Sequence, residues 1–194
     1  MTGDRGFTIV ESAVSIALVG IVMTAATSFF VINTRVGREQ NDTDIAVNLA
    51  IDALSRVRSI RGSSLPYGRD AAASHLQWNS PAPGVAAYQA DSVETWDPAA
   101  SAGSGSTALL PTDPVTTAVG GLTYSQNFYV GKCWQSDATG ACGPAAGTGD
   151  VPMFRVIVAI TWPDAAACPA TICSYVTATL VSSAAADPVF LLSG

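Results

Sequence analysis

Glu11 is the residue whose setting most needs a chemical explanation. It lies within an apolar stretch that runs from Phe7 to Ile32, and no other charged residue follows it until Arg35. A carboxylate in a segment of this kind costs on the order of 3 kcal/mol in lipid and usually serves a function. An ion pair with an ammonium group recovers much of that cost. Glu11 therefore predicts a cationic partner.

The apolar stretch from Phe7 to Ile32 exceeds the roughly 20 residues that an α-helix needs to cross a bilayer. A secretory signal peptide has a shorter apolar core, of about 7–15 residues, and a small-residue cleavage site before a polar mature start. No such site follows the stretch here. A plain signal anchor accounts for the length, but it gives no role to Gly6 or to Glu11. These two residues require a third interpretation.

The stretch GFTIVE, from Gly6 to Glu11, resembles the processing site of type IV prepilins and type II secretion pseudopilins. The resemblance implies that a membrane prepilin peptidase cuts after Gly6 on the cytoplasmic side and methylates the new N-terminal residue, Phe7. It also implies that Glu11, the fifth residue after the cut, pairs with the N-terminal amine of a neighbouring subunit. That pairing would favour assembly into a filament over the separate monomer.

A second helical pattern follows the apolar stretch, from Val36 to Ile60. Its apolar residues recur at spacings of three and four, with charged and amide side chains between them, as in an amphipathic helix. These apolar residues are Ile45, Leu49, Ala53, Val57 and Ile60. We expect one continuous helix from Phe7 to Arg61, roughly 80 Å long at 1.5 Å per residue, which ends before Gly62 and Pro66. The spine helix of pilins has this form.

The region after this helix is poor in periodic pattern. Between Asn79 and Gly121, 29 of 43 residues are Gly, Pro, Ser, Thr or Ala, which predicts a long irregular loop with one short element near Tyr88 to Trp96. Apolar residues then alternate in the C-terminal third, which predicts antiparallel strands over 122–130, 153–162 and 174–182. The last two strands are expected to form a hairpin.

Two local pairs of cysteines lie in the C-terminal third. Cys133 and Cys142 enclose eight residues, and Cys168 and Cys173 enclose four. Zinc sites favour spacings of two to four residues between cysteines and often add histidine, whereas the chain has one histidine, His75. Two disulfides are the better interpretation, and they place this C-terminal part of the chain outside the cytoplasm. Four cysteines allow three pairings, and the local pairing Cys133–Cys142 with Cys168–Cys173 is the simplest.

Catalytic and ligand-binding motifs are scarce. His75 lies in the loop-like stretch AAASHLQW without a nucleophile motif nearby, so it is expected to be a surface residue, and no enzymatic function or cofactor is predicted. Asp91, Glu94 and Asp97 could offer oxygen ligands to calcium, but they lack the pattern of a known calcium loop, and no metal site is predicted. The net charge of −6 makes nucleic acid an unlikely partner.

The predicted fold is α+β, with a long spine helix packed on a small antiparallel sheet. The predicted parts are a leader over 1–6, a membrane and assembly helix over 7–34, its amphipathic continuation over 35–61, a variable irregular region over 62–121 and a β head over 122–194. The head is expected outside the cytoplasm, although Arg35 and Arg38 by themselves favour the opposite orientation under the positive-inside rule.

The predicted function is that of a minor pilin of the pilus-modification type, first held in the inner membrane and then assembled at the cell surface. Its expected partners are prepilin peptidase, other pilin subunits, an inner-membrane assembly platform and lipid. One alternative is a pseudopilin of a type II secretion or DNA-uptake machine. Another, from a different class, is a single-pass, membrane-anchored binding domain that never assembles.

Overall fold

The computed structural model describes residues 8–136, 139–164, 168 and 171–184. It contains one long helix followed by short helices and a β-sheet, and the chain divides into two compact units, Met1–Asp42 and Thr43–Gly194. Helix α1 includes residues of both units. The elements are α1 (Ile9–Ser59), η1 (Gly62–Ser64), α2 (Ala71–Asn79), α3 (Ala86–Gln89), β1 (Val93–Glu94), η2 (Ser104–Thr107), β2 (Val115–Val119), β3 (Leu122–Gln135), β4 (Cys142–Gly143), β5 (Val151–Pro163) and β6 (Ile172–Ser182).

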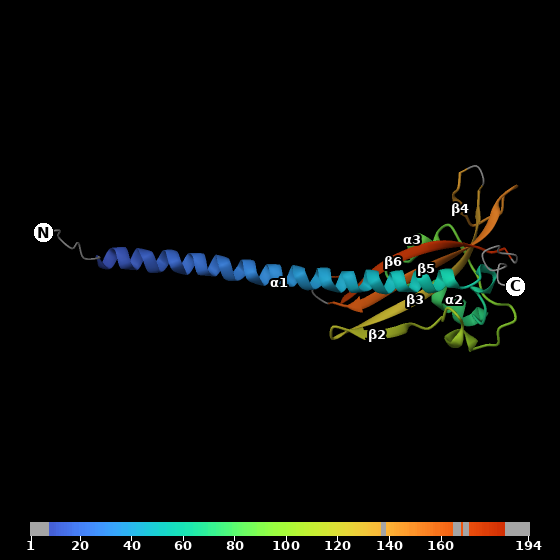
Figure 1. Ribbon diagram of the computed structural model, residues 1–194, viewed down its shortest axis with the longest axis horizontal. Helices are drawn as coiled ribbons and strands as arrows, with labels where there is room; N and C mark the ends of the chain where they lie inside the picture. Colours follow the sequence, from blue (N-terminus) through green and yellow to red (C-terminus); the bar gives the residue numbers. More distant parts are fainter. Residues whose placement is uncertain (1–7, 137–138, 165–167, 169–170, 185–194) are drawn as a thin grey trace. The chain divides into compact units, whose positions relative to one another are not determined.

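The second unit is built on an antiparallel sheet in which β1, β3, β5 and β6 are neighbours in that order. Strands β2 and β4 also pair with β3, one toward each end of it. The β5–β6 register runs from Met153 opposite Ser182 to Pro163 opposite Ile172, so the hairpin predicted for the last two strands is confirmed. Figure 1 shows these strands with the second half of α1 running along them. The α+β layout of a long helix and an antiparallel sheet is thus as predicted.

One face of the sheet packs against the second half of α1. The alternating apolar residues of β3 and β5 supply the sheet side of this core, and Phe128, Val156, Val158 and Ile160 are fully buried in it. The helix side is centred on small residues: Ala46, Ala50, Ala53 and Val57 are buried, while Ile45, Leu49, Leu54 and Ile60 are partly buried at its edges. Alanines at the centre let the helix backbone approach the sheet closely.

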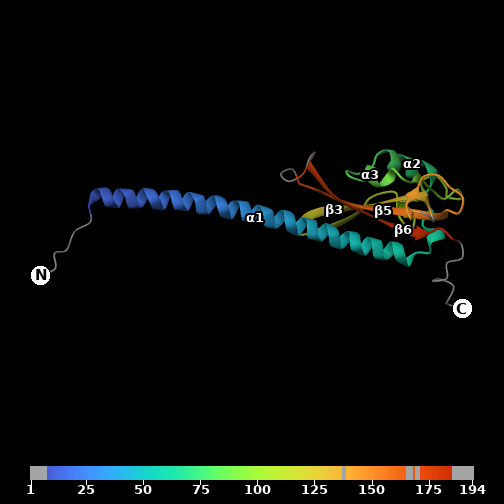
Figure 2. The same cartoon turned by 90° about the horizontal axis from the view of Figure 1, so that it is seen from above.

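The opposite face of the sheet is covered by the α2–α3 region, as Figure 2 shows. Val85 packs there with Tyr129, Ile157 and Ala159, and Trp78 lies partly buried beside them. The Tyr129 hydroxyl accepts a hydrogen bond from the N–H of Ala82 at 2.8 Å, and burial raises the pKa of this phenol. The sheet is therefore apolar on both faces, which explains why β5 is buried over most of its length.

The region expected to be a long irregular loop contains more regular structure than predicted. Besides the short element near Tyr88 to Trp96, which corresponds to α3 and β1, it includes η2 and the strand β2. The stretch AAASHLQW was expected to be loop-like, and this was wrong, because it forms α2 with His75 in its middle. Asp70 caps that helix by accepting a hydrogen bond from the N–H of Ala73, and three alanines with high helix propensity follow the cap.

Gly62 has a different role from the one expected. It was predicted to stop the long helix, but α1 ends at Ser59, and Gly62 is buried where η1 meets the end of β6. A Cβ atom at this position would overlap the carbonyl oxygen of Ser182. The glycine is thus required by close backbone packing between the segment after α1 and the sheet.

Candidate processing and assembly segment

The proposed cleavage position, between Gly6 and Phe7, lies outside the described residues. The structure describes the chain from Thr8 onward, and α1 begins at Ile9. The Thr8 Oγ1 atom accepts a hydrogen bond from the N–H of Glu11 at 3.3 Å, which is the geometry of a helix N-cap. The helix therefore starts directly after the expected cleavage position, and Glu11 lies in its first turn.

The first half of α1 presents its apolar side chains outward along its whole length. Ile9 is 90% exposed, and residues as far along as Phe30 and Ile32 remain more than half exposed. An 18-residue window of this helix has a mean hydropathy of 2.2, and none of it is buried within the chain. By length and composition α1 can cross a membrane. Lipid would be a favourable solvent for this exposed apolar surface.

The hydroxyl and amide side chains within the apolar run are almost all satisfied by the helix itself. Ser15 donates to the carbonyl oxygen of Glu11 at 2.8 Å, and Thr24 donates to that of Gly20 at 2.9 Å. Thr27, Ser28, Asn33 and Thr34 likewise donate to carbonyl oxygens three or four residues earlier. Internal satisfaction of this kind is what a helix in lipid requires, since no water is available as a partner.

Glu11 differs from these groups because it carries a charge. It is the only charged residue between Ile9 and Thr34, and its carboxylate makes no hydrogen bond or ion pair within the part of the chain that the structure describes. The positive end of the helix dipole lies nearby and favours a negative charge in the first turn, but only by a fraction of a kcal/mol to about 1 kcal/mol. A carboxylate with this environment can accept a cationic partner from outside the described chain.

The cysteines of the head are joined as two disulfides, Cys133–Cys142 and Cys168–Cys173, with Cα–Cα distances of 5.5 and 5.1 Å. The first connects β3 to β4, which is itself paired with β3 through Gln135 and Cys142. The second closes the turn between β5 and β6. Within the described residues all cysteines are paired, so the head presents no free thiol there.

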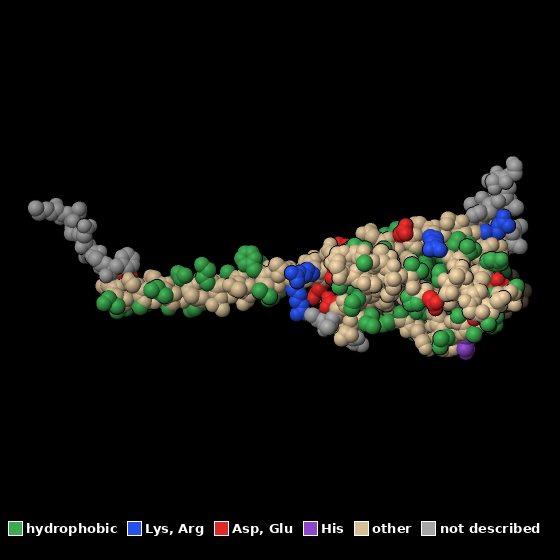
Figure 3. Space-filling view, turned by 90° about the horizontal axis from the view of Figure 1, so that it is seen from below, with side chains coloured by type: hydrophobic (Ala, Val, Ile, Leu, Met, Phe, Trp, Pro, Cys, Tyr) green, Lys and Arg blue, Asp and Glu red, His purple; other side chains and the backbone are tan. Residues whose placement is uncertain are grey.

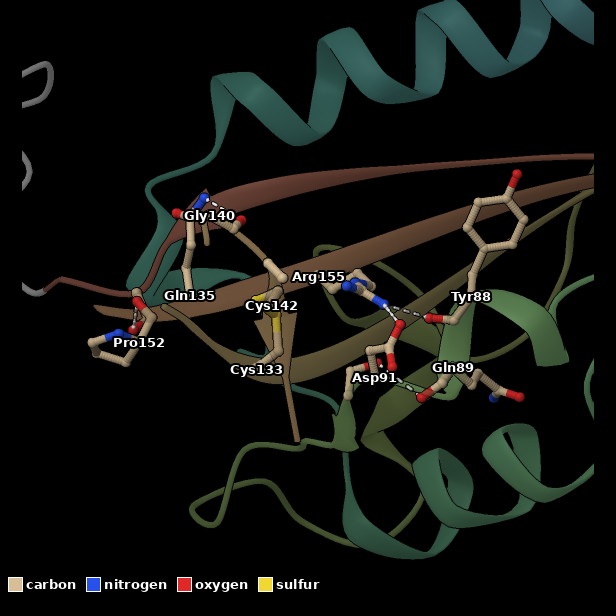
Figure 4. The surroundings of a disulfide bond; sticks show 12 residues. Tyr88, Gln89, Asp91, Cys133, Gln135, Gly140, Cys142, Pro152 and Arg155 are labelled. Carbon is tan, nitrogen blue, oxygen red and sulfur yellow. Dashed lines mark hydrogen bonds and ion pairs between the residues drawn. A yellow bond between two sulfur atoms is a disulfide. The ribbon is translucent and has the colours of Figure 1, made fainter. Parts of the chain in front are cut away.

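The three acids considered as calcium ligands take separate partners. Asp97 accepts hydrogen bonds from the N–H groups of Gly68 and Ala99, both at 2.9 Å, which hold its pKa below the usual value. Glu94 Oε1 lies 2.9 Å from Nδ1 of His75. Asp91 lies 3.9 Å from Nη1 of Arg155, and the same nitrogen donates to the carbonyl oxygen of Tyr88 at 3.0 Å, as Figure 4 shows. These acids thus connect the segment 91–97 to Gly68, to α2 and to β5. No metal-binding cluster occurs among the described residues.

A buried polar network that sequence reasoning missed lies at the start of α2. The Arg69 guanidinium is buried and donates to the carbonyl oxygen of Leu110 at 2.6 Å and to Oε1 of Gln77 at 2.7 Å. Loss of solvation lowers the pKa of Arg69 to about 10. The sequence carries one signal for this site, an Asp70 cap ahead of three alanines, but none for its long-range contacts. The network is structural, since it fixes a loop to a helix.

Residues 1–27 match a family model described as the prokaryotic N-terminal methylation motif. The match covers Gly6, Phe7 and Glu11 together with much of the exposed apolar helix. It confirms the resemblance to type IV pilin-like proteins that the sequence indicated. No curated protein and no solved structure matches the chain at a significant level.

Proposed function

Starting from a type IV pilin-like chain with a prepilin-type methylation motif, we propose that it is a minor pilin, a structural subunit cleaved after Gly6 and assembled through α1 into a type IV pilus or related filament. The observation that carries the proposal is the carboxylate of Glu11, which has no partner among the described residues and lies on an exposed apolar helix whose other side-chain polar groups are nearly all satisfied internally. The apolar surface of that helix is favourably buried in lipid before assembly and in a filament core afterwards. Pairing of Glu11 with a cation of a neighbouring subunit favours the filament over the lipid.

The proposal assigns distinct roles to the parts of the chain. The leader, residues 1–6, addresses the subunit to prepilin peptidase, which cuts after Gly6 and methylates Phe7. The first half of α1 holds the subunit in the inner membrane and then engages other subunits, with the help of an inner-membrane assembly platform. The head lies outside the cytoplasm, which its two disulfides favour. A structural subunit needs no catalytic residues or cofactor.

Orientation depends on more than the arginine count. Arg35 and Arg38 follow the apolar run and would favour a cytoplasmic head, but Arg35 is paired with Glu39 through Nε and Oε1 at 3.1 Å. The two disulfides support the opposite side, because disulfides persist in oxidising compartments. Labelling of an introduced surface cysteine in intact cells with a membrane-impermeant maleimide tests this orientation. The cysteine is expected to be labelled in intact cells, because the proposed orientation places the head outside the cytoplasmic membrane.

Mass spectrometry of the N-terminus in the native host tests the proposal. The mature chain should begin with N-methylphenylalanine at Phe7. Gly6→Val should leave the leader attached, because the peptidase subsite for glycine admits no side chain. Gly3→Val, which makes the same change within the leader, should still be cut. A chain that keeps Met1, or one that lacks the whole apolar segment, would instead support a membrane-anchored or secreted binding domain.

The same preparation distinguishes the pilus from a secretion or DNA-uptake machine. Recovery of the mature chain in sheared surface filaments is expected for a minor pilin. Retention of the mature chain in the cell envelope, with loss of protein secretion or DNA uptake on deletion, would identify a pseudopilin. Both outcomes require cleavage after Gly6. They therefore show which of the two machines the chain serves, and they do not depend on a further test of the cleavage motif.

A further inference from the structure

The sheet of the head has a free edge strand on each side. β6 lies last in the order β1, β3, β5, β6, and its one strand neighbour among the described residues is β5. On the other side, β2 pairs with β3 alone. Figure 1 shows β2 and β6 on opposite sides of the sheet. The edge strands have 11 residues in β6 and 5 in β2, and each has one side without a neighbouring strand.

The register of β5 and β6 shows which main-chain groups of β6 lie on its free side. The N–H of Ser183 donates to the carbonyl oxygen of Pro152 at 3.3 Å, so the odd-numbered residues of this segment are the ones bonded to β5. Residues alternate in an antiparallel pair, and the N–H and C=O groups of the even-numbered residues therefore point away from β5. Between the ends of the strand these residues are Ser174, Val176, Ala178 and Leu180.

The turn after β2 identifies the outward groups of that strand in the same way. Gly120 and Gly121 form a two-residue turn, and both have positive φ. The residues that flank such a turn form a hydrogen-bonded pair, so Val119 is bonded to β3. The N–H and C=O groups of Thr116 and Ala118 therefore point away from β3.

Most of these outward groups lack a hydrogen-bond partner in the part of the chain that the structure describes. The Tyr88 hydroxyl donates to the carbonyl oxygen of Val176 at 3.3 Å, which is the one hydrogen bond that described residues make to them. Thr116 and Ala118 are exposed. Leu180 is 36% exposed, and the other outward residues of β6 are half-buried. Both edges are therefore open to a further strand.

Neither edge strand carries the features that usually protect a free edge. The sequences are ICSYVTATLVS in β6 and VTTAV in β2, without a charged residue, proline or glycine. Charged side chains, prolines and bulges are the usual means of preventing an edge from pairing. Figure 3 shows, by contrast, exposed Lys, Arg, Asp and Glu side chains elsewhere on the head. Uncharged edges rich in β-branched residues favour pairing with each other.

We propose that β6 of one copy of this chain pairs with β2 of a second copy, so that the sheet continues from one head to the next. This inference rests on the proposed function, because the subunits of a filament share one orientation. Strand directions alternate across β2, β3, β5 and β6, since each neighbouring pair is antiparallel. β2 and β6 therefore run in opposite directions, and copies in the same orientation bring them together as an antiparallel pair.

The same arrangement matches the two faces of the sheet. Thr117 lies opposite Tyr124, which is buried in the core beneath α1, and Tyr175 and Val181 of β6 also pack against that core. The odd-numbered residues of both strands thus share the α1 face. Hydrogen bonds between the even-numbered residues of the two strands require this match. Because the contact joins two different edges, it can repeat from copy to copy without closing, as a filament requires.

Crosslinking between differently tagged copies tests the pairing in a host that assembles the filament. One copy carries Thr177→Cys in β6, and the other carries Thr117→Cys in β2. Both positions lie on the α1 face, and the native cysteines are held in disulfides. After treatment with a short bismaleimide, we expect crosslinks between the two kinds of copy in sheared filaments. Crosslinks between copies of the same kind should be several-fold fewer, because identical edges do not meet.

Ala178→Pro gives a variant and its matched control. In the copy with Thr177→Cys, it removes an outward N–H and leaves the hydrogen bonds to β5 in place, so the crosslink yield should fall several-fold. In the copy with Thr117→Cys, the same change lies on an edge that the measured crosslink does not use, and the yield should stay unchanged. Ala118→Pro should give the reverse pattern. Comparison between copies thus separates pairing from any effect of proline on folding.

Three results would overturn the proposal: no crosslinks between the two kinds of copy, a preference for copies of the same kind, or proline effects at both positions that do not depend on the copy. N-terminal mass spectrometry of the same preparation reports separately on the proposed function. An intact leader, or absence of the chain from filaments, contradicts the proposed function. A mature chain in filaments that lacks these crosslinks contradicts the strand pairing alone.

Discussion

Asp70 and Gly105 are joined directly although 35 residues separate them: the Asp70 Oδ2 atom accepts a hydrogen bond from the N–H of Gly105 at 3.0 Å. The other oxygen, Oδ1, accepts from the N–H of Ala73 at 3.0 Å and starts α2. The carboxylate is buried. One side chain therefore both begins a helix and fixes the η2 segment, which has few apolar side chains of its own with which to pack.

Replacement of Asp70 should destabilise the head. Asp70→Ala removes a helix cap and leaves the buried N–H of Gly105 without its partner, so we expect the free energy of unfolding to fall by about 2–4 kcal/mol. Asp113→Ala is the matched control, since Asp113 is exposed, and it should change stability by less than about 0.5 kcal/mol. Urea unfolding of the full chain in detergent, followed by tryptophan fluorescence, measures both. Equal losses in the two variants would contradict the assigned role.

The head should lose stability on the acid side of the pH scale. The N–H of Ala73 is the main cause that holds the pKa of Asp70 below its usual value, and Gly105 contributes while burial opposes. As pH falls below the unfolded value of about 3.9, the unfolded chain takes up this proton before the folded chain does. The contribution of Asp70 to the free energy of unfolding is therefore fully present above the unfolded-state pKa, and it is lost as pH falls through the lower pKa of the folded state. Unfolding curves of wild type and Asp70→Asn should converge at low pH, and parallel curves would be inconsistent with this account.

Glu11 should matter for assembly and not for cleavage. Glu11→Ala leaves Gly6 and Phe7 unchanged, so the variant should still be cut and methylated. It should enter filaments several-fold less than wild type, because it lacks the acceptor for the amine of a neighbour. Ser12→Ala changes the adjacent polar residue without removing charge and serves as the control. Quantitative immunoblots of membranes and sheared filaments measure both steps, and wild-type entry of Glu11→Ala would exclude the ion-pair mechanism for this subunit.

Loss of the Cys168–Cys173 disulfide should weaken the head without unfolding it. The disulfide closes a ring of six residues, which in the chain-entropy model contributes about 2 kcal/mol. The ladder between β5 and β6 extends well beyond this turn, as far as Met153 and Ser182, so the sheet should persist. The double variant Cys168→Ser, Cys173→Ser should melt several degrees lower by circular dichroism. Cys133→Ser with Cys142→Ser is the comparison, and its larger ring predicts a slightly larger loss.

The features that the sequence alone determined are those with a local cause. The length and hydrophobicity of the run after Glu11 predict α1, and alternation of apolar residues predicts β3, β5 and β6, because period and side-chain direction are properties of one segment. The motif from Gly6 to Glu11 is also local, since a peptidase reads a short stretch of chain. The Asp70 cap before α2 is a local signal as well, and the prediction of a loop over this stretch did not use it.

The tertiary structure alone decided which distant segments meet. The helix side of the core centres on Ala46 and Ala50 because the sheet approaches there, although Ile45 and Leu49 are the more hydrophobic neighbours. Gly131 lies where an added Cβ would come within 2.7 Å of the Trp78 ring, and Gly105 meets Asp70 across 35 residues. Such contacts depend on how the chain closes in space, and hydrogen bonds and close packing between remote residues leave no periodic trace in either segment.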